Sequence, residues 1–177
     1  MTTVAIVGAG PLGRRLALAA ARAGYRVLLE DVMPSNLHHA REALRQSLGP
    51  EALPAVAFVS AIEDAVREAD VAIDCVPDEL ESKLEIFCLV DRMAPPRTVI
   101  ATPTTKLSIA DLAACTYRAD RCVAIAAEPG ALAEGTARDL LLRSTLQTAP
   151  ETIQIMQEFW VRLGFEPRFE TEADPAS

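Results

Sequence analysis

The feature that most constrains this 177-residue chain is the order of structures predicted by its first thirty-one residues. A short β-branched apolar run over residues 3–7 is typical of a buried strand and stops at the segment Gly8-Ala9-Gly10-Pro11-Leu12-Gly13. Apolar residues at helical spacing follow over residues 11–23, where the leading proline suits the first turn of a helix. A second strand is predicted over residues 26–30, and Asp31 comes directly after it. This order predicts a βαβ unit with a glycine-rich first turn.

Each glycine of the turn has a separate physical task. Gly8 permits the tight turn, Gly10 lets a pyrophosphate approach the backbone because it lacks a Cβ, and Gly13 lets the helix pack closely on the sheet. Asp31 can accept hydrogen bonds from ribose hydroxyls and would repel the 2′-phosphate of NADP. Glu30 is the neighbouring alternative, but in a strand its side chain points the other way. We therefore predict that the unit binds NAD, with a ligand-free glycine turn as the alternative. The predicted contacts in this unit are Gly8, Gly10, Pro11, Leu12, Gly13 and Asp31.

Strand and helix patterns alternate along the rest of the chain. Further strands are predicted over residues 55–60, 71–76, 97–101, 121–126, 140–144 and 165–169. Further helices are predicted over residues 34–48, 63–68, 78–93, 109–115 and 151–163, while residues 128–136 are expected to be irregular. This alternation predicts an α/β Rossmann fold, a doubly wound, mostly parallel sheet with helices on both faces. We expect residues 1–171 to form this domain and residues 172–177 to form a short tail.

Composition and charge exclude several kinds of partner. The net charge of −8 does not provide the basic face that nucleic acid needs. No apolar run approaches the roughly 20 residues that span a bilayer, and the first residues do not resemble a signal peptide. We therefore expect a cytoplasmic protein with no membrane or nucleic-acid partner. No metal site is expected, because the spacing of the cysteines and histidines is unsuitable; these residues are Cys75, Cys88, Cys115, Cys122, His38 and His39.

Several ordered motifs beyond the glycine turn carry a resemblance to a known family. They are Val4-Ala5-Ile6-Val7-Gly8-Ala9-Gly10, Ala23-Gly24-Tyr25, Asp31-Val32, Ala69-Asp70-Val71, the segments 76–83 and 101–109, and the helical stretch 148–165. With these motifs, almost the whole chain resembles the N-terminal NAD-binding domain of the 3-hydroxyacyl-CoA dehydrogenases. Residues 76–83, V-P-D-E-L-E-S-K, are similar to the family's V-P-E-x-x-x-x-K stretch, with aspartate in place of glutamate. Residues 101–109 are similar to the family's A-T-N-T-S-S-L-S-I.

The resemblance implies which residues meet the nicotinamide half of NAD. Asp78 and Lys83 fall on positions where the family contacts it, and Val76 and Pro77 are expected to line the site with them. From the residues alone, Asp78 and Lys83 could instead mark a solvated helix N-terminus, where an acid favours the helix dipole. Both interpretations stay open at this point.

The catalytic positions of the family are not retained in this sequence. The resemblance implies a histidine base oriented by a glutamate. The histidine position falls on Ala126, and the glutamate would lie in the segment Leu140-Leu141-Leu142. The substrate-side asparagine of the family is replaced by Pro103. Glu128 and Thr105 are the catalytic candidates that remain in this region.

The family continues into a helical domain that completes the acyl-CoA site, and we expect that domain to be absent here. These departures predict an NAD(H)-binding protein without standalone 3-hydroxyacyl-CoA dehydrogenase activity. One alternative is an active NAD-dependent oxidoreductase, completed by a partner subunit or by an unusual acid or base among Glu128, Thr105 and Lys106. Another is an NAD(H)-responsive regulatory or assembly subunit, in which a second copy or a partner covers the surface left by the helical domain.

Overall fold

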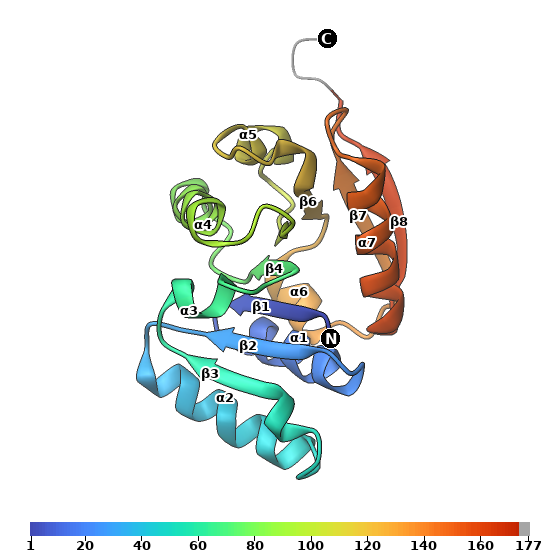
Figure 1. Cartoon of the computed structure of the whole chain (residues 1–177). Helices are drawn as coiled ribbons and strands as arrows, with labels where there is room; N and C mark the ends of the chain where they lie inside the picture. The colour runs from blue at the N-terminus through green and yellow to red at the C-terminus, as the bar shows by residue number, and fades with distance from the viewer. Residues whose placement is uncertain (174–177) are drawn as a thin grey trace.

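The computed structural model describes residues 1–173 and arranges them around one eight-stranded sheet (Figure 1). From edge to edge, the strands are β3 (Val56–Val59), β2 (Arg26–Glu30), β1 (Thr3–Val7), β4 (Val71–Asp74), β5 (Val99–Pro103), β6 (Cys122–Ile125), β7 (Asp139–Ser144) and β8 (Glu166–Thr171). Neighbouring strands are parallel except β6 and β7, which pair antiparallel. The strand order reverses between β1 and β4, and doubly wound sheets bind ligands at such a switch point.

Helices cover both faces of the sheet, which confirms the predicted Rossmann architecture (Figure 1). One face carries α1 (Pro11–Arg22), α2 (Pro34–Ser47), α6 (Pro129–Glu134) and α7 (Pro150–Arg162). The other face carries α3 (Ile62–Val66), α4 (Leu80–Met93) and α5 (Ile109–Ala114). Two short 3-10 helices, Leu53–Ala55 and Ala119–Arg121, precede β3 and β6.

The central strand β1 shows how the sequence builds two core layers. All five of its residues are buried, as expected for a central parallel strand that is covered on both faces. Val4 and Ile6 pack in the layer of α1, α2 and α7, whereas Ala5 packs in the layer of α3, α4 and α5. Trp160 and Phe87 are the largest apolar side chains buried in the two layers. The sheet is therefore fixed from both sides, and the loops at its carboxyl edge have a rigid base.

One local prediction is wrong, and the bounds of another element are shifted. The segment 128–136 was expected to be irregular, but it contains α6. Leu132 is the buried residue of this helix, and its carbonyl accepts a hydrogen bond from the Arg15 guanidinium of α1. The helix therefore depends on its contact with α1 and not on a repeated apolar pattern that the sequence could reveal. Strand β5 begins and ends two residues later than predicted, at Val99 and Pro103. Proline is tolerated there because it occupies the end of the strand.

The end of the described chain is tied to the domain. The Glu172 carboxylate accepts hydrogen bonds from the N–H groups of Ile109 and Ala110 at 2.9 and 3.2 Å. Residues 174–177 of the predicted tail lie outside the described residues, so the division at residue 171 stays a prediction. Within residues 1–173, no helix is long and apolar enough to cross a membrane.

Candidate functional site

Two of the three motif glycines are required by the fold itself. Gly8 has a φ of +105°, which L side chains rarely adopt, and a Cβ there would lie 3.1 Å from the Cys75 carbonyl oxygen. Gly13 is buried in α1, where a Cβ would lie 1.8 Å from the carbonyl oxygen of Gly8. A larger residue at Gly13 would push α1 away from the turn below it, and one at Gly8 would press on the backbone of Cys75 in a strained conformation. Both glycines are therefore explained without any ligand.

Gly10 has no such structural reason to be glycine. Its φ of −73° and ψ of −169° suit any residue, and an added Cβ would meet no described atom within 4 Å. It is the N-cap of the twelve-residue helix α1, and no described side chain caps the first N–H groups of that helix. The space beside Gly10 is thus a cradle that a Cβ would fill, next to free N–H groups and the positive end of a helix dipole. A pyrophosphate group fits these requirements.

Asp31 fastens the end of β2 to the glycine turn. Its Oδ2 accepts hydrogen bonds from the Ala9 N–H at 2.9 Å and from the Asn36 side-chain amide at 3.1 Å. Its Oδ1 accepts from the Met33 N–H at 2.8 Å. The carboxylate is only partly buried, and of its roughly four acceptor positions about one remains for a ligand. Sequence reasoning missed Asn36, although an amide in the first turn after the acid was a usable signal.

Two cavities form one crevice at the carboxyl ends of β1, β2 and β4. The first, of about 370 Å³, lies between the end of β2 and the β4–α4 loop. The second, of about 390 Å³, lies between the glycine turn, the same loop and α6. Asp31 lines the 370 Å³ cavity, and Pro11, Leu12 and Asp78 line the 390 Å³ cavity. Both are lined by Gly10, Val76 and Pro77, so the structure brings most of the predicted cofactor contacts together.

Lys83 lies behind the wall of this crevice. It is fully buried, and its ammonium donates to Thr102 Oγ1 at 2.9 Å, to Asp74 Oδ2 at 3.2 Å and to the Val76 carbonyl oxygen at 3.5 Å. Burial raises the pKa of the Asp74 carboxyl, and the charge of Lys83 opposes that rise. The interpretation of Lys83 as part of a solvated helix N-terminus is therefore wrong. In this structure the ammonium holds the β4–α4 loop through its hydrogen bond to the Val76 carbonyl oxygen. A direct contact between Lys83 and the cofactor stays a prediction.

Asp78 bridges the β4–α4 loop and the loop after β5. Its Oδ2 accepts a hydrogen bond from the Thr105 N–H at 3.4 Å, and its Oδ1 is buried without a partner among residues 1–173. The two residues come from segments that are far apart in sequence, so the structure brings together one predicted cofactor contact and one catalytic candidate. A ligand donor at Oδ1 would complete the hydrogen bonding of this carboxylate.

The catalytic candidates are exposed around the same end of the crevice. Glu128 precedes α6 and lines the 390 Å³ cavity together with Lys106. Glu128 and Thr105 also line an adjoining cavity of about 300 Å³, whose wall includes Ala126. The side chain of Glu128 does not cap α6, and Thr105 and Lys106 are exposed. Within the described chain, no group of three side chains could hold a metal ion.

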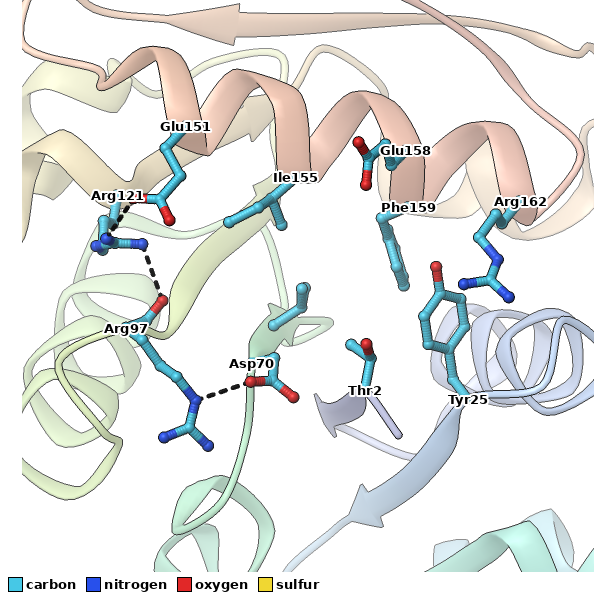
Figure 2. A pocket seen from close by; sticks show the side chains of 11 residues that line it. Thr2, Tyr25, Asp70, Arg97, Arg121, Glu151, Ile155, Glu158, Phe159 and Arg162 are labelled. Carbon is cyan, nitrogen blue, oxygen red and sulfur yellow. Dashed lines mark hydrogen bonds and ion pairs between the residues drawn. The ribbon is translucent and has the colours of Figure 1, made fainter.

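Another cavity, of about 300 Å³, lies beside the amino ends of β1 and β4 and differs in its chemistry (Figure 2). Figure 2 shows Arg97 paired with Asp70 and Arg121 paired with Glu151. The nitrogen–oxygen distances of these two ion pairs are 2.8 and 3.0 Å. Although burial acts to raise it, the pKa of Asp70 is lowered by a hydrogen bond from the Thr3 N–H and by Arg97. These charges are matched within the chain. The cavity also lies away from the switch point, so it is not the candidate cofactor site.

Comparison with known proteins agrees with this geometry. A family model described as the NAD-binding domain of 3-hydroxyacyl-CoA dehydrogenase matches residues 3–126. The probable 3-hydroxybutyryl-CoA dehydrogenase of Bacillus subtilis (strain 168) is 29% identical over 133 residues, which cover 68% of this chain and 46% of that protein. L-carnitine dehydrogenase of Burkholderia mallei is 34% identical over 130 residues, which cover 68% of this chain and 40% of that protein. The chain thus spans less than half the length of these relatives.

Solved structures confirm the fold. The crystal structure of (S)-3-hydroxybutyryl-CoA dehydrogenase from Ralstonia eutropha matches with a TM-score of 0.86 at 24% identity, covering 98% of this chain and 64% of that chain. The family model includes the glycine turn, Asp31 and the β4–α4 loop, so it covers the residues that form the crevice. NAD, the predicted cofactor, is the cofactor for which this domain family is named. The chain belongs to the NAD-binding domain family of the 3-hydroxyacyl-CoA dehydrogenases.

Proposed function

We propose that this chain binds NAD(H) in the crevice and does not oxidise 3-hydroxyacyl-CoA on its own. The observation that carries the binding proposal is Gly10, because neither backbone conformation nor packing explains a glycine there. A pyrophosphate in the open space accepts hydrogen bonds from the first N–H groups of α1 and is stabilised by the helix dipole.

The two ends of the crevice suit the two halves of the dinucleotide. Asp31 accepts hydrogen bonds from the adenosine ribose and repels a 2′-phosphate, so NAD is preferred to NADP. The nicotinamide half lies between the β4–α4 loop and α6, where Val76 and Asp78 orient it. Lys83 keeps that loop in place through the Val76 carbonyl. When bound, NAD supplies the hydride acceptor, and the residues of the chain set its orientation.

Among residues 1–173, no base is held in a fixed orientation at the nicotinamide end of the crevice. A general base must lie within hydrogen-bond distance of the substrate hydroxyl and must be held there. Ala126 offers no proton acceptor in its side chain, and the segment Leu140-Leu141-Leu142, where the family's glutamate would lie, offers no carboxylate. Asp139, at the start of β7, lines the adjoining 300 Å³ cavity but is exposed. Glu128 is exposed at the start of a short helix and is not held as a cap. We therefore infer that the isolated chain has no standalone dehydrogenase activity.

A second candidate function is an oxidoreductase completed by another subunit. The 300 Å³ cavity lined by Thr105, Ala126 and Glu128 adjoins the nicotinamide end and has room for a group from a partner or from a second copy. Such a group could supply the missing base and the second wall of a substrate cleft. An NAD(H)-responsive regulatory or assembly subunit would use the same surface for docking without chemistry.

Isothermal titration calorimetry of the full chain with NAD, NADH and NADPH tests the binding proposal. We expect NAD and NADH to bind, NADPH not to bind measurably, and the Gly10→Val variant to lose binding. Gly49→Val is the matched control, because a Cβ at Gly49 also meets no described atom within 4 Å but lies outside the crevice. If the folded wild-type chain binds neither NAD nor NADH, the proposal is wrong.

A spectrophotometric assay of NADH formation from a 3-hydroxyacyl-CoA separates the two candidate functions. We expect no turnover above the rate without protein. Turnover at an enzymatic rate that disappears in Glu128→Gln would contradict the first proposal and support an oxidoreductase with an unusual base. Turnover that requires a second purified subunit would support the partner-completed enzyme.

A further inference from the structure

Glu30 is a buried acid at the floor of the adenosine end of the crevice. It is the last residue of β2, and its side chain is only 2% exposed. Leu28, two residues earlier on the strand, packs in the layer of α3 and α4. Because strand side chains alternate between faces, Glu30 lies on that same face. It lines the 370 Å³ cavity together with Ile62 and Ile86, which belong to α3 and α4.

The carboxyl group of Glu30 lacks the partner that its burial demands. Its Oε1 atom is buried without a hydrogen-bond partner among residues 1–173. Burial and, second, the charge of Asp31 raise the pKa of Glu30 from 4.5 to about 7. Buried polar groups in native proteins are almost always hydrogen-bonded, and an unpaired one needs an explanation. A hydrogen-bond donor on a ligand in the adjoining cavity would provide one.

The rest of the cavity indicates the kind of ligand. Asp31 and Asn36 form its polar side, where the proposed ribose contact lies. The aliphatic side chains that line this cavity and not the 390 Å³ cavity are Val7, Val32, Ile62 and Ile86. Aliphatic walls with one convergent polar group suit a flat heteroaromatic ring whose orientation is fixed by a single hydrogen bond. A ring attached to the ribose would lie between these walls and beside Glu30.

We propose that Glu30 recognises the base of the bound nucleotide, with its carboxylate accepting a hydrogen bond from the exocyclic 6-amino group of adenine. This inference rests on the proposed NAD binding and adds the base specificity of that site. A 6-oxo purine presents an acceptor at the same position, so two acceptors would face each other in a buried place. Glu30 thereby selects adenine against hypoxanthine and guanine.

Calorimetric titration at pH 8 with NAD and with nicotinamide hypoxanthine dinucleotide tests the inference. In the hypoxanthine compound an oxygen replaces the 6-amino group and N1 carries a hydrogen, so position 6 changes from a donor to an acceptor. At pH 8 the Glu30 carboxylate is mainly ionised and can only accept. We expect the wild-type chain to bind the hypoxanthine compound about tenfold or more weakly than NAD, as buried polar mismatches produce large discrimination. The full chain is used throughout.

Two substitutions at position 30 assign the discrimination to Glu30. In Glu30→Gln the amide can turn to donate or to accept, so the ratio of the two Kd values should fall to about two or less. Glu30→Met, which has no strong acceptor, should give the same low ratio. Asp31→Asn is the control: it should weaken both ligands by a similar factor and keep the ratio, because it acts on the ribose.

The outcomes separate this inference from the proposed function. Equal affinity of the wild-type chain for both dinucleotides overturns base recognition by Glu30 and leaves NAD binding intact. A tenfold ratio that persists in Glu30→Gln and Glu30→Met also overturns it. If neither dinucleotide binds to the folded wild-type chain, the proposed function fails, and this inference fails with it. Urea unfolding of each variant verifies that the comparison is made between folded proteins.

Discussion

Gly13 and Gly10 lie three residues apart in one turn, yet a methyl group added to each meets very different surroundings. At Gly13 it would lie 1.8 Å from a backbone oxygen that cannot rotate away, whereas at Gly10 it meets open space. We expect Gly13→Ala to lower the free energy of unfolding by about 3 kcal/mol, and Gly10→Ala to lower it by about 1 kcal/mol or less. Urea unfolding at pH 7 measures both. Equal losses would contradict the separation of fold-required and ligand-required glycines.

The pKa of Glu30 predicts how pH affects stability. The folded-state pKa of about 7 lies above the ordinary value of 4.5, so the folded protein holds the proton more tightly than the unfolded chain. The contribution of Glu30 to stability therefore falls as pH rises from about 4.5 to about 7 and is constant above that. The full fall is about 3 kcal/mol at most.

Glu30→Gln removes this titration and tests the prediction without interference from other groups. The difference in the free energy of unfolding between Glu30→Gln and the wild-type chain should grow in favour of the variant between pH 4.5 and 7, and then level off. Urea unfolding at half-unit pH intervals gives this difference directly. A difference that stays flat across the range would show that the Glu30 carboxyl is not desolvated in the folded protein.

Residues of the site differ in how well the sequence predicts them. Gly8, Gly10 and Asp31 were predictable, because a turn between a strand and a helix places them by local spacing alone. Glu30 and Asp74 were not, because each is the polar last residue of an apolar strand and its role depends on which element packs over it. The roles of such residues can be recognised only once the positions of the neighbouring helices are known.

At the scale of elements, Lys83 joins α4 to β4 and β5 through one buried ion pair. Its partners are Asp74 at the end of β4 and Thr102 in β5, and both charged side chains are at most 1% exposed. Lys83→Met would leave the Asp74 carboxylate buried without its counter-charge, so we expect the free energy of unfolding to fall by about 3–5 kcal/mol. The double variant with Asp74→Asn should recover part of this loss. Urea unfolding of both single variants and the double variant gives the coupling energy, and strict additivity would contradict the pairing.

Elements differ in predictability for physical reasons. The helices α1, α4 and α7 were predicted to within two residues at each end, because each has an apolar face at helical spacing that a sheet buries. Helix α6 was missed, because six residues with one buried leucine carry no periodic signal. Its stability comes from its contact with α1, including the hydrogen bond from Arg15 to Leu132, and such a contact between distant segments leaves no local pattern.

For the whole molecule, the alternation of strands and helices sufficed to predict the sheet, since parallel strands need helical crossovers and these cover both faces. The antiparallel pairing of β7 with β6 was not predictable from the pattern, because an apolar strand has the same sequence signature in either direction. Nor could the pattern show that Glu172, after the last strand, would bind the start of α5. The sequence alone therefore did not determine the direction of strand pairing or the contacts between segments that are distant in the chain.

Binding should also change the stability of the whole domain. A ligand that binds only the folded state at one hundred times its Kd raises the free energy of unfolding by about 2.7 kcal/mol. We therefore expect NAD to raise the Tm of the wild-type chain, and NADPH at the same concentration to leave it unchanged. Differential scanning calorimetry measures this shift, with Gly10→Val as the variant that should not respond and Gly49→Val as the one that should. A shift of the same size with NADPH would contradict the role of Asp31.

The three hydrogen bonds that Asp31 accepts have a consequence for the kinetics of recognition. By holding Ala9, Met33 and Asn36, this carboxylate fixes the glycine turn and the start of α2 in position before any nucleotide arrives. The loss of conformational entropy needed to order the crevice therefore accompanies folding and not association. Encounter with a dinucleotide then requires no rearrangement of these two segments, so we expect fast capture at the adenosine end, with the residence time setting the affinity.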